Sequence, residues 1–595
     1  MNIPEEAIEA AVIATEDDVS TATRRNWRRL GVEDESERLI TRANKRRSTK
    51  RFAPVEYFSH RENIAKFESL AHDLGSDAIE LEPLFFELGV QYLKDHGVLD
   101  PDGRSEFSEL DNFIQAGAKQ YSRGTHQSGV SLPLAEDDPM GCLYQTIITE
   151  ARKNELGIYY TPRPVVETMV SDIRLAQGQK VFDPCCGTLA YLLRVPNVQP
   201  ENIYACDIDP VAILIAKFNF YRRFPSSSAR NIRVADYIHD SVIFGSQRFD
   251  YIVTNPPWGA QTNTPVHFSS IRSGETFSLV IERSLTQLAP GGELRILLPE
   301  SVLNVRTHRD VRSLILSHAN LLSIRQFDHL FTGVTTKYMS MTIARDGLAP
   351  TVQVSLGGQS WEVRKSVYSD QKDLIFRLSD SLDEQVIEKV LRKKVSDLSR
   401  SMWALGIVTG NNKDKLLDSP SPGSEAIFTG KEITPYALKP AKKFIFFDRA
   451  NLQQAARDEF YRADIKLVYK FISKRLTFAI DDTGSLFLNS ANILIPHVPN
   501  LSIFSVAAFL NSPLYQYLYM KLFREVKILK GNLLQLPFPD LSSDDDLMLT
   551  DLVKQVRSGV PAAETKINDL IYQIYELDQE EISRVENELY GTATR

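Results

Sequence analysis

Hydrophobic and polar positions follow a repeating pattern between about residues 157 and 345 of this 595-residue chain. Short apolar runs that predict strands alternate there with amphipathic stretches that have helical spacing. The predicted strands are Lys180–Asp183, Ile203–Asp207, Ile232–Ala235, Tyr251–Thr254, Leu294–Pro299 and Tyr338–Ala344, and the predicted helices include Pro210–Phe224 and Thr276–Leu288. Alternation of this kind is typical of an α/β fold with a doubly wound, mostly parallel sheet.

The pattern changes on both sides of this region, and five segments are predicted. Residues 61–150 are expected to be helical, with Leu84, Phe85, Leu88 and Tyr92 apolar at helical spacing. The other predicted segments are a basic stretch at 1–60, the α/β domain at 151–348, an α+β domain at 349–558 and a Glu-rich helical tail at 559–595.

Composition places the chain among ordinary globular proteins. Hydrophobic residues make up 43% and charged residues 25%, and no run reaches the roughly 18 apolar residues of a membrane helix. The four cysteines fit neither a disulfide framework nor a zinc site, and the acidic N-terminus does not resemble a signal peptide. We therefore expect a cytoplasmic protein without a metal and without a membrane partner.

The net charge of −8 includes one strongly basic stretch. Eleven Lys and Arg lie between Arg24 and Arg51, against four acids, and such a stripe can hold a polyanion. Residues 17–31 predict a small helix-turn-helix whose second helix carries Arg24, Arg25, Arg28 and Arg29 as DNA contacts. A plain amphipathic helix with a solvated basic face is the alternative.

Acidic side chains follow the first three predicted strands. Asp183 ends the first strand and is followed by a turn of small residues, which suits a polar cofactor. Asp207 ends the second strand and is placed to bind ribose hydroxyls, although Asp207 or Asp209 could instead only cap the helix that starts at Pro210. Asp236, after the third strand, could accept a hydrogen bond from an adenine amino group.

The fourth strand leads into Asn255-Pro256-Pro257-Trp258. The two prolines stiffen the loop, because each restricts φ to about −65°. The Asn255 side-chain oxygen and the Pro256 carbonyl can accept both hydrogens of an exocyclic amine, while Trp258 stacks on its ring. Accepting these hydrogen bonds would aim the nitrogen lone pair at an electrophile without a strong general base.

These motifs occur in an order that resembles the gamma-class N6-adenine DNA methyltransferases of restriction–modification systems. The motifs are Asp138-Pro-Met-Gly-Cys-Leu-Tyr144, Gly157-Ile-Tyr-Tyr160-Thr161-Pro162, Asp183-Pro-Cys-Cys-Gly187, Asp207-Ile-Asp-Pro210, Asp236 and Asn255-Pro-Pro-Trp258. The resemblance covers about residues 138 to 345, and it includes type I modification subunits and single-chain type II enzymes. It implies a Rossmann-like class I methyltransferase domain that uses S-adenosylmethionine and flips its target base.

The resemblance also implies roles for individual residues. Asp207 would hold the cofactor's ribose and Asp236 its adenine, while Asn255 and Pro256 orient the target amine and Trp258 and Phe331 sandwich the target base. The remaining cofactor-binding residues would be Tyr160, Thr161 and Pro162 at the methionine end, with Asp183, Cys185 and Gly187 in the loop after the first strand.

One position departs from the family pattern. The family usually has a glycine where this chain has Leu189, and a leucine there could crowd the cofactor pocket, weaken cofactor affinity or move the loop slightly. A subunit that binds DNA or assists assembly, with a degenerate cofactor site, is therefore an alternative function. Methylation of RNA adenine or of a protein glutamine is another alternative, because such enzymes also use Asn-Pro-Pro-aromatic loops.

The region after residue 349 resembles, more loosely, the target-recognition domain of the single-chain enzymes. Basic side chains there are predicted to contact the phosphates of double-stranded DNA: Lys442, Lys443, Lys470, Lys474 and Arg475. No nuclease site with partner acids is evident, so we expect any cutting to be done by a separate restriction nuclease, and a separate specificity subunit is a further possible partner. The expected location is the nucleoid of a prokaryotic cell.

Overall fold

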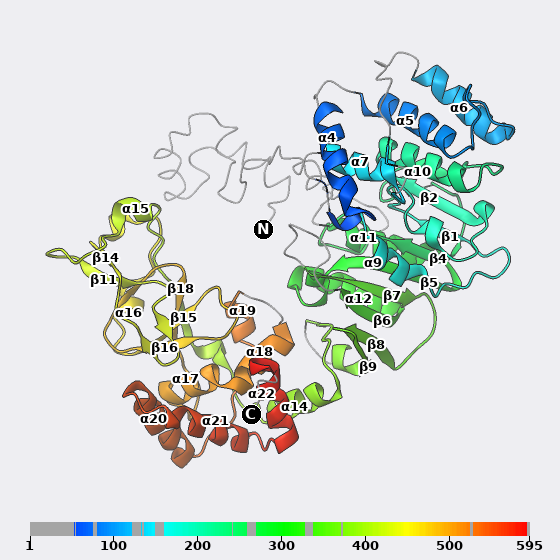
Figure 1. Cartoon of the computed structure of the whole chain (residues 1–595). Helices are drawn as coiled ribbons and strands as arrows, with labels where there is room; N and C mark the ends of the chain where they lie inside the picture. The colour runs from blue at the N-terminus through cyan, green and yellow to red at the C-terminus, as the bar shows by residue number, and fades with distance from the viewer. Residues whose placement is uncertain are drawn as a thin grey trace. The chain divides into compact units, whose positions relative to one another are not determined.

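The chain divides into two compact units, which are described separately (Figure 1). The computed structural model describes residues 53, 55–74, 80–121, 132–133, 136–148, 160–240, 242–258, 269–327, 337–369, 373–523 and 527–591. Within these residues, the first unit extends to Phe376 and the second begins at Arg377. The predicted helix-turn-helix with its four arginines, and the predicted stacking residue Phe331, lie outside the described residues.

A sheet of nine described strands, in the order β3-β2-β1-β4-β5-β7-β6-β8-β9, forms the centre of the first unit. The strands are β1 (Val181–Asp183), β2 (Ile203–Asp207), β3 (Ile232–Val234), β4 (Phe249–Thr254), β5 (Leu288–Pro299), β6 (Asn320–Phe327), β7 (Tyr338–Ala344), β8 (Thr351–Leu356) and β9 (Gln359–Arg364).

Strands β1 to β5 are parallel to one another, whereas β7 runs antiparallel to both β5 and β6. β1 lies between β2 and β4, with Phe182 paired to Tyr204 on one side and to Ile252 on the other. Because the chain winds outward in opposite directions from β1 and β4, their carboxyl ends form the topological switch point of the sheet. The predicted doubly wound α/β fold is confirmed.

Helices surround this sheet, and the N-terminal helical layer is part of the same core. The helices are α4 (Ile64–Leu74), α5 (Leu81–Asp95), α6 (Ser108–Gln120), α7 (Pro139–Ile147), α9 (Arg163–Val170), α10 (Pro210–Arg223), α11 (Thr276–Gln287), α12 (Arg309–His318) and α13 (Ser366–Ser369). α5 packs closely on α10, because a β-carbon at Gly89 would lie only 2.3 Å from the Phe218 ring. Buried side chains of both layers, such as Phe85 and Val181, belong to one hydrophobic cluster.

The sheet extends past the boundary that the sequence pattern suggested near residue 349. β8 pairs with β6, with Ser323 opposite Gln353, and β9 pairs with β8. Both strands therefore belong to the α/β unit, and the sheet ends only at Arg364. The apolar run Asn320–Phe327 that makes this pairing possible was not predicted as a strand.

The second unit combines small sheets with a helical part. Its strands are β10 (Met402–Leu405), β11 (Glu425–Phe428), β12 (Ile433–Thr434), β13 (Ala437–Leu438), β14 (Lys443–Ile445), β15 (Lys466–Lys470), β16 (Phe478–Asp481), β17 (Leu486–Phe487) and β18 (Ala491–Ile495). Its helices are α14 (Ser381–Arg392), α15 (Asn412–Lys415), α16 (Asp458–Tyr461), α17 (Ile503–Asn511), α18 (Pro513–Phe523), α19 (Lys530–Leu533), α20 (Ser543–Arg557), α21 (Ala562–Ile574) and α22 (Gln579–Tyr590).

Two hydrophobic clusters stabilise this second unit. One joins α17, α18 and the C-terminal helices, and the other lies between the small sheets. Among the described helices, none is long and apolar enough to cross a membrane. The same described ranges hold no group of three or more His, Cys, Asp or Glu side chains suited to a metal ion.

Candidate active site

The candidate site lies at the carboxyl ends of β1, β2 and β4, at the switch point of the sheet. Asp183 is the last residue of β1, Asp207 is the last residue of β2, and Asn255 directly follows β4. Because these strands are parallel neighbours, the three side chains start from the same edge of the sheet. Ligands of open α/β sheets bind at this edge.

The loop after β1 is held against the end of β2 by backbone groups. Cys186 N donates a hydrogen bond to the Cys206 carbonyl at 3.0 Å. Gly187 N donates to Oδ2 of Asp207 at 2.9 Å. Gly187 has a φ of 50°, and a β-carbon there would lie 3.1 Å from the Tyr160 ring, so the loop approaches Tyr160 closely.

Two acids at this edge are suited to a positively charged ligand. Asp183 is fully buried, and its Oδ1 accepts from Cys185 N at 3.1 Å while its Oδ2 has no hydrogen-bond partner. Burial raises the pKa of Asp183 to about 7, with the Asp207 carboxylate adding to the effect, and burial raises the pKa of Asp207 to about 6. Among the described residues, neither acid forms an ion pair, so a bound cation would favour their ionised forms.

The two acids of the turn after β2 have different partners. Asp209 Oδ1 accepts from Val211 N at 3.0 Å and caps α10, and its Oδ2 accepts from the Tyr144 hydroxyl. Asp207 instead accepts from Gly187 N and from Asp209 N, the latter at 3.0 Å. The alternative role as a helix cap therefore applies to Asp209, and Asp207 remains the ribose-binding candidate.

Asp236 lies in a turn after β3, where its carboxylate accepts hydrogen bonds from backbone groups of the same turn. Its Oδ1 accepts from Ile238 N at 2.9 Å and from His239 N at 3.1 Å, and its Oδ2 lies 2.8 Å from His239 Nδ1. The side chain is one-third exposed. These bonds hold the carboxylate in one orientation, and its predicted contact with an adenine stays a prediction.

The Tyr160-Thr161-Pro162 segment, directly ahead of α9, contacts the loop after β4. The buried Thr161 hydroxyl oxygen accepts from Asn255 Nδ2 at 3.0 Å and from the Tyr191 hydroxyl at 3.2 Å. This bond fixes the orientation of the Asn255 amide. Two motifs that are almost one hundred residues apart in the sequence therefore form one hydrogen-bonded unit.

Aromatic side chains continue the site along the edge of the sheet. Trp258 Nε1 donates to the Leu297 carbonyl at 3.2 Å, and its ring lies 6.1 Å from the ring of Tyr338. Tyr338 in turn stacks on Phe327 at 6.1 Å. Neither Tyr338 nor Phe327 was predicted as a site residue, although Tyr338 is the first residue of a predicted strand. Pro256 is buried and Pro257 half-buried between Asn255 and Trp258.

Leu189 occupies the hydrophobic core. Its side chain is fully buried in the core cluster, and its expected effect on the cofactor pocket stays a prediction. Its φ of 78° lies in the left-handed region, which is unfavourable for a residue with a β-carbon and which glycine adopts readily. The departure from the family pattern thus concerns backbone strain and core packing.

The predicted DNA contacts of the second unit lie on exposed or half-buried positions. Lys442 and Lys474 are exposed, and Lys470 at the end of β15 is half-buried. Lys443 pairs with Asp418, and Arg475 donates to the Leu589 carbonyl at 2.7 Å. Arg475 therefore contributes to the packing of α22, and contact of these five residues with DNA stays a prediction.

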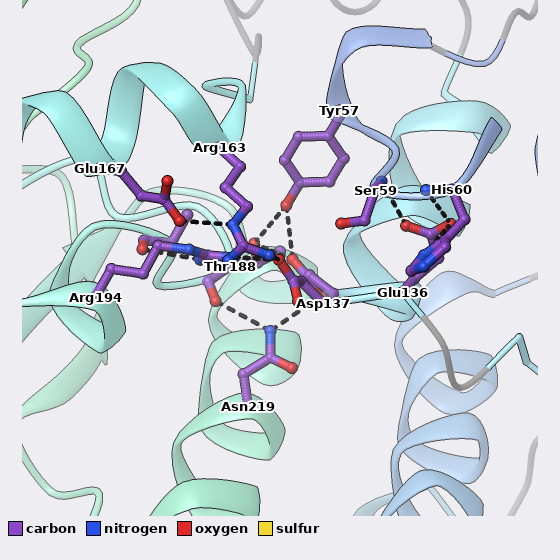
Figure 2. Close-up of polar contacts among 12 residues, drawn as sticks. Tyr57, Ser59, His60, Glu136, Asp137, Arg163, Glu167, Thr188, Arg194 and Asn219 are labelled. Atoms are coloured by element: carbon purple, nitrogen blue, oxygen red, sulfur yellow. Dashed lines mark hydrogen bonds and ion pairs between the residues drawn. The ribbon is translucent and has the colours of Figure 1, made fainter.

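A cluster around the acidic run Glu136–Asp138 was not assigned a role from the sequence. Figure 2 shows that these acids meet side chains from the N-terminal segment, from α9 and from the loop after β1. The signal available in the sequence was a run of three consecutive acids, the last of which, Asp138, is the first residue of the Asp138–Tyr144 motif.

The strand order, the acids that end β1 and β2, and the Asn-Pro-Pro-Trp loop after β4 define a Rossmann-like class I methyltransferase domain. Residues 135–395 match the N-6 DNA Methylase family, and residues 425–538 match a TaqI-like C-terminal specificity domain. These matches confirm the predicted resemblance to restriction–modification adenine methyltransferases.

Individual relatives agree with this family. The type II methyltransferase M.VspI of Vibrio sp. is 29% identical over 306 residues, covering 49% of this chain and 74% of that protein. The EcoEI type I methylase subunit of Escherichia coli is 23% identical over 227 residues, covering 34% of this chain and 46% of that protein. The structure of the type IIL restriction-modification enzyme MmeI in complex with DNA has the same fold, with a TM-score of 0.54 at 12% identity over 89% of this chain and 93% of that chain.

Proposed function

We propose that this chain is a site-specific DNA methyltransferase that methylates the N6 amino group of adenine with S-adenosylmethionine and flips the target base out of the duplex. The observation that carries the proposal is the position of Asn255-Pro-Pro-Trp258 at the end of β4, beside the buried Asp183 that ends β1 and the half-buried Asp207 that ends β2. The chain would act as the modification component of a restriction–modification or related defence system.

The residues around β1 and β2 fit the cofactor. Asp183 and Asp207 supply two carboxylates without an ion-pair partner among the described residues, and Asp183 Oδ2 is buried without a hydrogen bond. Asp183 would face the cofactor's ammonium group and Asp207 its ribose hydroxyls, with Tyr160 closing the methionine end. When bound, S-adenosylmethionine supplies an electrophilic methyl group on a positively charged sulfur.

The residues after β4 would prepare the target amine. The Asn255 side-chain oxygen and the Pro256 carbonyl accept its two hydrogens, which turns the nitrogen lone pair away from the ring and toward the methyl group. The bond from Asn255 to Thr161 holds the amide in place before the base arrives. Trp258 offers an aromatic surface for the flipped base, whose unstacking costs a few kcal/mol.

The second unit favours DNA over the alternative substrates. Its match to a TaqI-like specificity domain supports recognition of double-stranded DNA by the chain itself, with phosphate contacts from its basic side chains. Methylation of RNA or of a protein glutamine would not need such a domain. A separate restriction nuclease, and a specificity subunit in a larger assembly, are the further partners that we propose, and a DNA substrate implies association with a prokaryotic nucleoid.

The experiment that tests the proposal is substitution of Asn255. We expect Asn255→Ala to lower the rate of adenine methylation by about 10²-fold or more, because one preorganised hydrogen-bond partner of the reacting group is lost. Binding of S-adenosylmethionine, measured by calorimetry, should change little, since Asn255 contacts the amine. The rate is measured as transfer of a labelled methyl group to DNA, with the methylated base identified by mass spectrometry.

Asn202→Ala is the matched control, because Asn202 is half-buried in the same domain but lies at the opposite end of β2 from the site. This control should methylate DNA at the parent rate. Near-parent methylation by Asn255→Ala would refute the assigned role of the loop, and methylated RNA or glutamine as the product would refute DNA as the substrate.

A further inference from the structure

The acidic run Glu136–Asp138 ties the N-terminal segment to the α/β domain (Figure 2). Glu136 accepts from the backbone of Ser59 at 2.7 Å and of His60 at 3.1 Å. Asp137 binds Arg163 at the start of α9 and Arg194 in the turn after the β1 loop, the latter at 3.1 Å. Each acid thus joins segments that are distant in the sequence.

Asp138 makes the connection that reaches the candidate cofactor loop. Its Oδ2 accepts from the Tyr57 hydroxyl at 2.7 Å and from the Thr188 hydroxyl at 2.5 Å. Its Oδ1 accepts from Asn219 Nδ2 at 3.1 Å, and the same amide also donates to the Thr188 carbonyl at 3.1 Å. Thr188 lies between Gly187, which binds Asp207, and Leu189, whose backbone is strained.

Tyr57 contacts the site a second time through its ring. Its ring centroid lies 5.4 Å from that of Tyr160, and the Tyr160 ring also lies close to Gly187, where a β-carbon would be 3.1 Å away. Burial, together with the negative charge of Asp138, raises the pKa of Tyr57 well above its usual range. The hydroxyl therefore stays protonated and donates to Asp138 throughout the working pH range.

We infer that Tyr57 is a positioning residue of the cofactor site, holding the loop through Asp138 and Thr188 and supporting Tyr160 through ring contact. The inference rests on the proposed function for the identity of the cofactor. Tyr57 lies outside residues 135–395, the part that matches the N-6 DNA Methylase family, so the N-terminal layer adds a site residue that this domain does not contain.

The test distinguishes the effect of the Tyr57 hydroxyl from the effect of its ring. Tyr57→Phe keeps the contact with Tyr160 and removes only the hydroxyl, with its hydrogen bonds to Asp138 and to the Thr188 hydroxyl, the latter at 3.3 Å, so the protein should remain folded. We expect its Kd for S-adenosylmethionine to rise by about threefold to tenfold, since a hydrogen bond to a charged group is lost. The KM for the cofactor should rise with it, while kcat at saturating cofactor stays within about twofold.

Hydrogen exchange on the cofactor-free protein gives a second measurement that does not depend on the ligand. The amides of Cys186, Gly187 and Leu189, all hydrogen-bonded in the parent, should exchange about threefold faster or more in Tyr57→Phe. In a double-mutant cycle, Tyr57→Phe should add little in the Asp138→Asn background, because both changes break the same connection.

Tyr121→Phe is the matched control. The Tyr121 hydroxyl donates to Glu82 at 3.0 Å in the same N-terminal layer, and its ring packs on Phe86 without contacting the loop. This variant should leave the Kd and the loop exchange unchanged. An unchanged Kd and unchanged exchange in Tyr57→Phe would overturn the inference, as would equal changes in both variants. A parent protein that does not bind S-adenosylmethionine would overturn the proposed function instead. The exchange comparison would then remain as the test of positioning.

Discussion

Two opposing contributions to the free energy of unfolding act at Leu189, the strain of its backbone and the burial of its side chain. Its left-handed backbone is unfavourable by about 1–2 kcal/mol, while truncating a fully buried leucine costs about 2–5 kcal/mol. The core contact outweighs the strain, which explains how a leucine can occupy a position with a left-handed backbone. The strain and the contact can be separated by two substitutions.

We expect both Leu189→Gly and Leu189→Ala to lower the melting temperature, because both remove the core side chain. Leu189→Ala should be the less stable by about 1 kcal/mol, since it keeps the strained φ that glycine relieves. Thermal melts and urea unfolding measure this order. The affinity for S-adenosylmethionine should not improve in Leu189→Gly, and tighter binding would show that the leucine crowds the pocket after all.

The raised pKa values of the buried Asp183 and the half-buried Asp207 predict that cofactor binding depends on pH. Without ligand, their pKa values are raised to about 7 and about 6, so both are largely protonated at pH 5. A bound cation favours the ionised forms and lowers these pKa values, so binding should release protons. The Kd for S-adenosylmethionine should therefore fall as the pH rises from 5 to about 7 and level off above it.

Calorimetry at pH 6 in two buffers with different ionisation enthalpies measures this proton release. Asp183→Asn provides the control, because it removes the group with the higher pKa and should reduce the number of protons released. An affinity that is constant between pH 5 and 8, with no dependence on buffer, would contradict the role of these acids.

At the scale of elements, local patterns gave most of the central sheet and its helices. The prediction for β2 matches the structure, and the helix predicted from Pro210 differs by one residue, because Asp209 caps it and Pro210 suits its first turn. β5 begins at Leu288, whereas the predicted strand began at Leu294. The prediction omitted the first residues of β5 because they include two glycines and a proline. Such residues usually interrupt strands.

The strands that were missed lie at the far edge of the sheet. β6, β8 and β9 carry polar residues on one face, as in Arg325 and Gln353, and only pairing with neighbouring strands distinguishes them from loops. Which strands β6, β8 and β9 pair with depends on tertiary contacts. The end of the α/β unit therefore could not be found from the local pattern alone.

At the scale of the whole molecule, the two units have separate hydrophobic cores. We expect a chain ending at Phe376 to fold, to bind S-adenosylmethionine with the parent Kd and to lose sequence-specific DNA binding. Ending the chain at Phe376 keeps β8 and β9 in the sheet and keeps the bond from Phe376 N to the Leu303 carbonyl.

A matched truncation at residue 350 removes β8 and β9 and leaves β6 with an open edge, so it should be less stable and less soluble. DNA binding is measured by competition between specific and random duplexes, and cofactor binding by calorimetry. A chain ending at Phe376 that still selects one DNA site would place recognition in the first unit.

The sequence by itself determined which residues form the candidate site, because Asn255-Pro-Pro-Trp258 and the acids at strand ends are local motifs and the strand order brings them to one edge of the sheet. Tertiary structure alone decided which of Asp207 and Asp209 caps a helix, where the Leu189 side chain lies and that Tyr57 reaches the cofactor loop. These outcomes depend on contacts between segments far apart in the chain. Periodicity describes which face of an element is buried, but the partner on that face is set by how the whole unit packs.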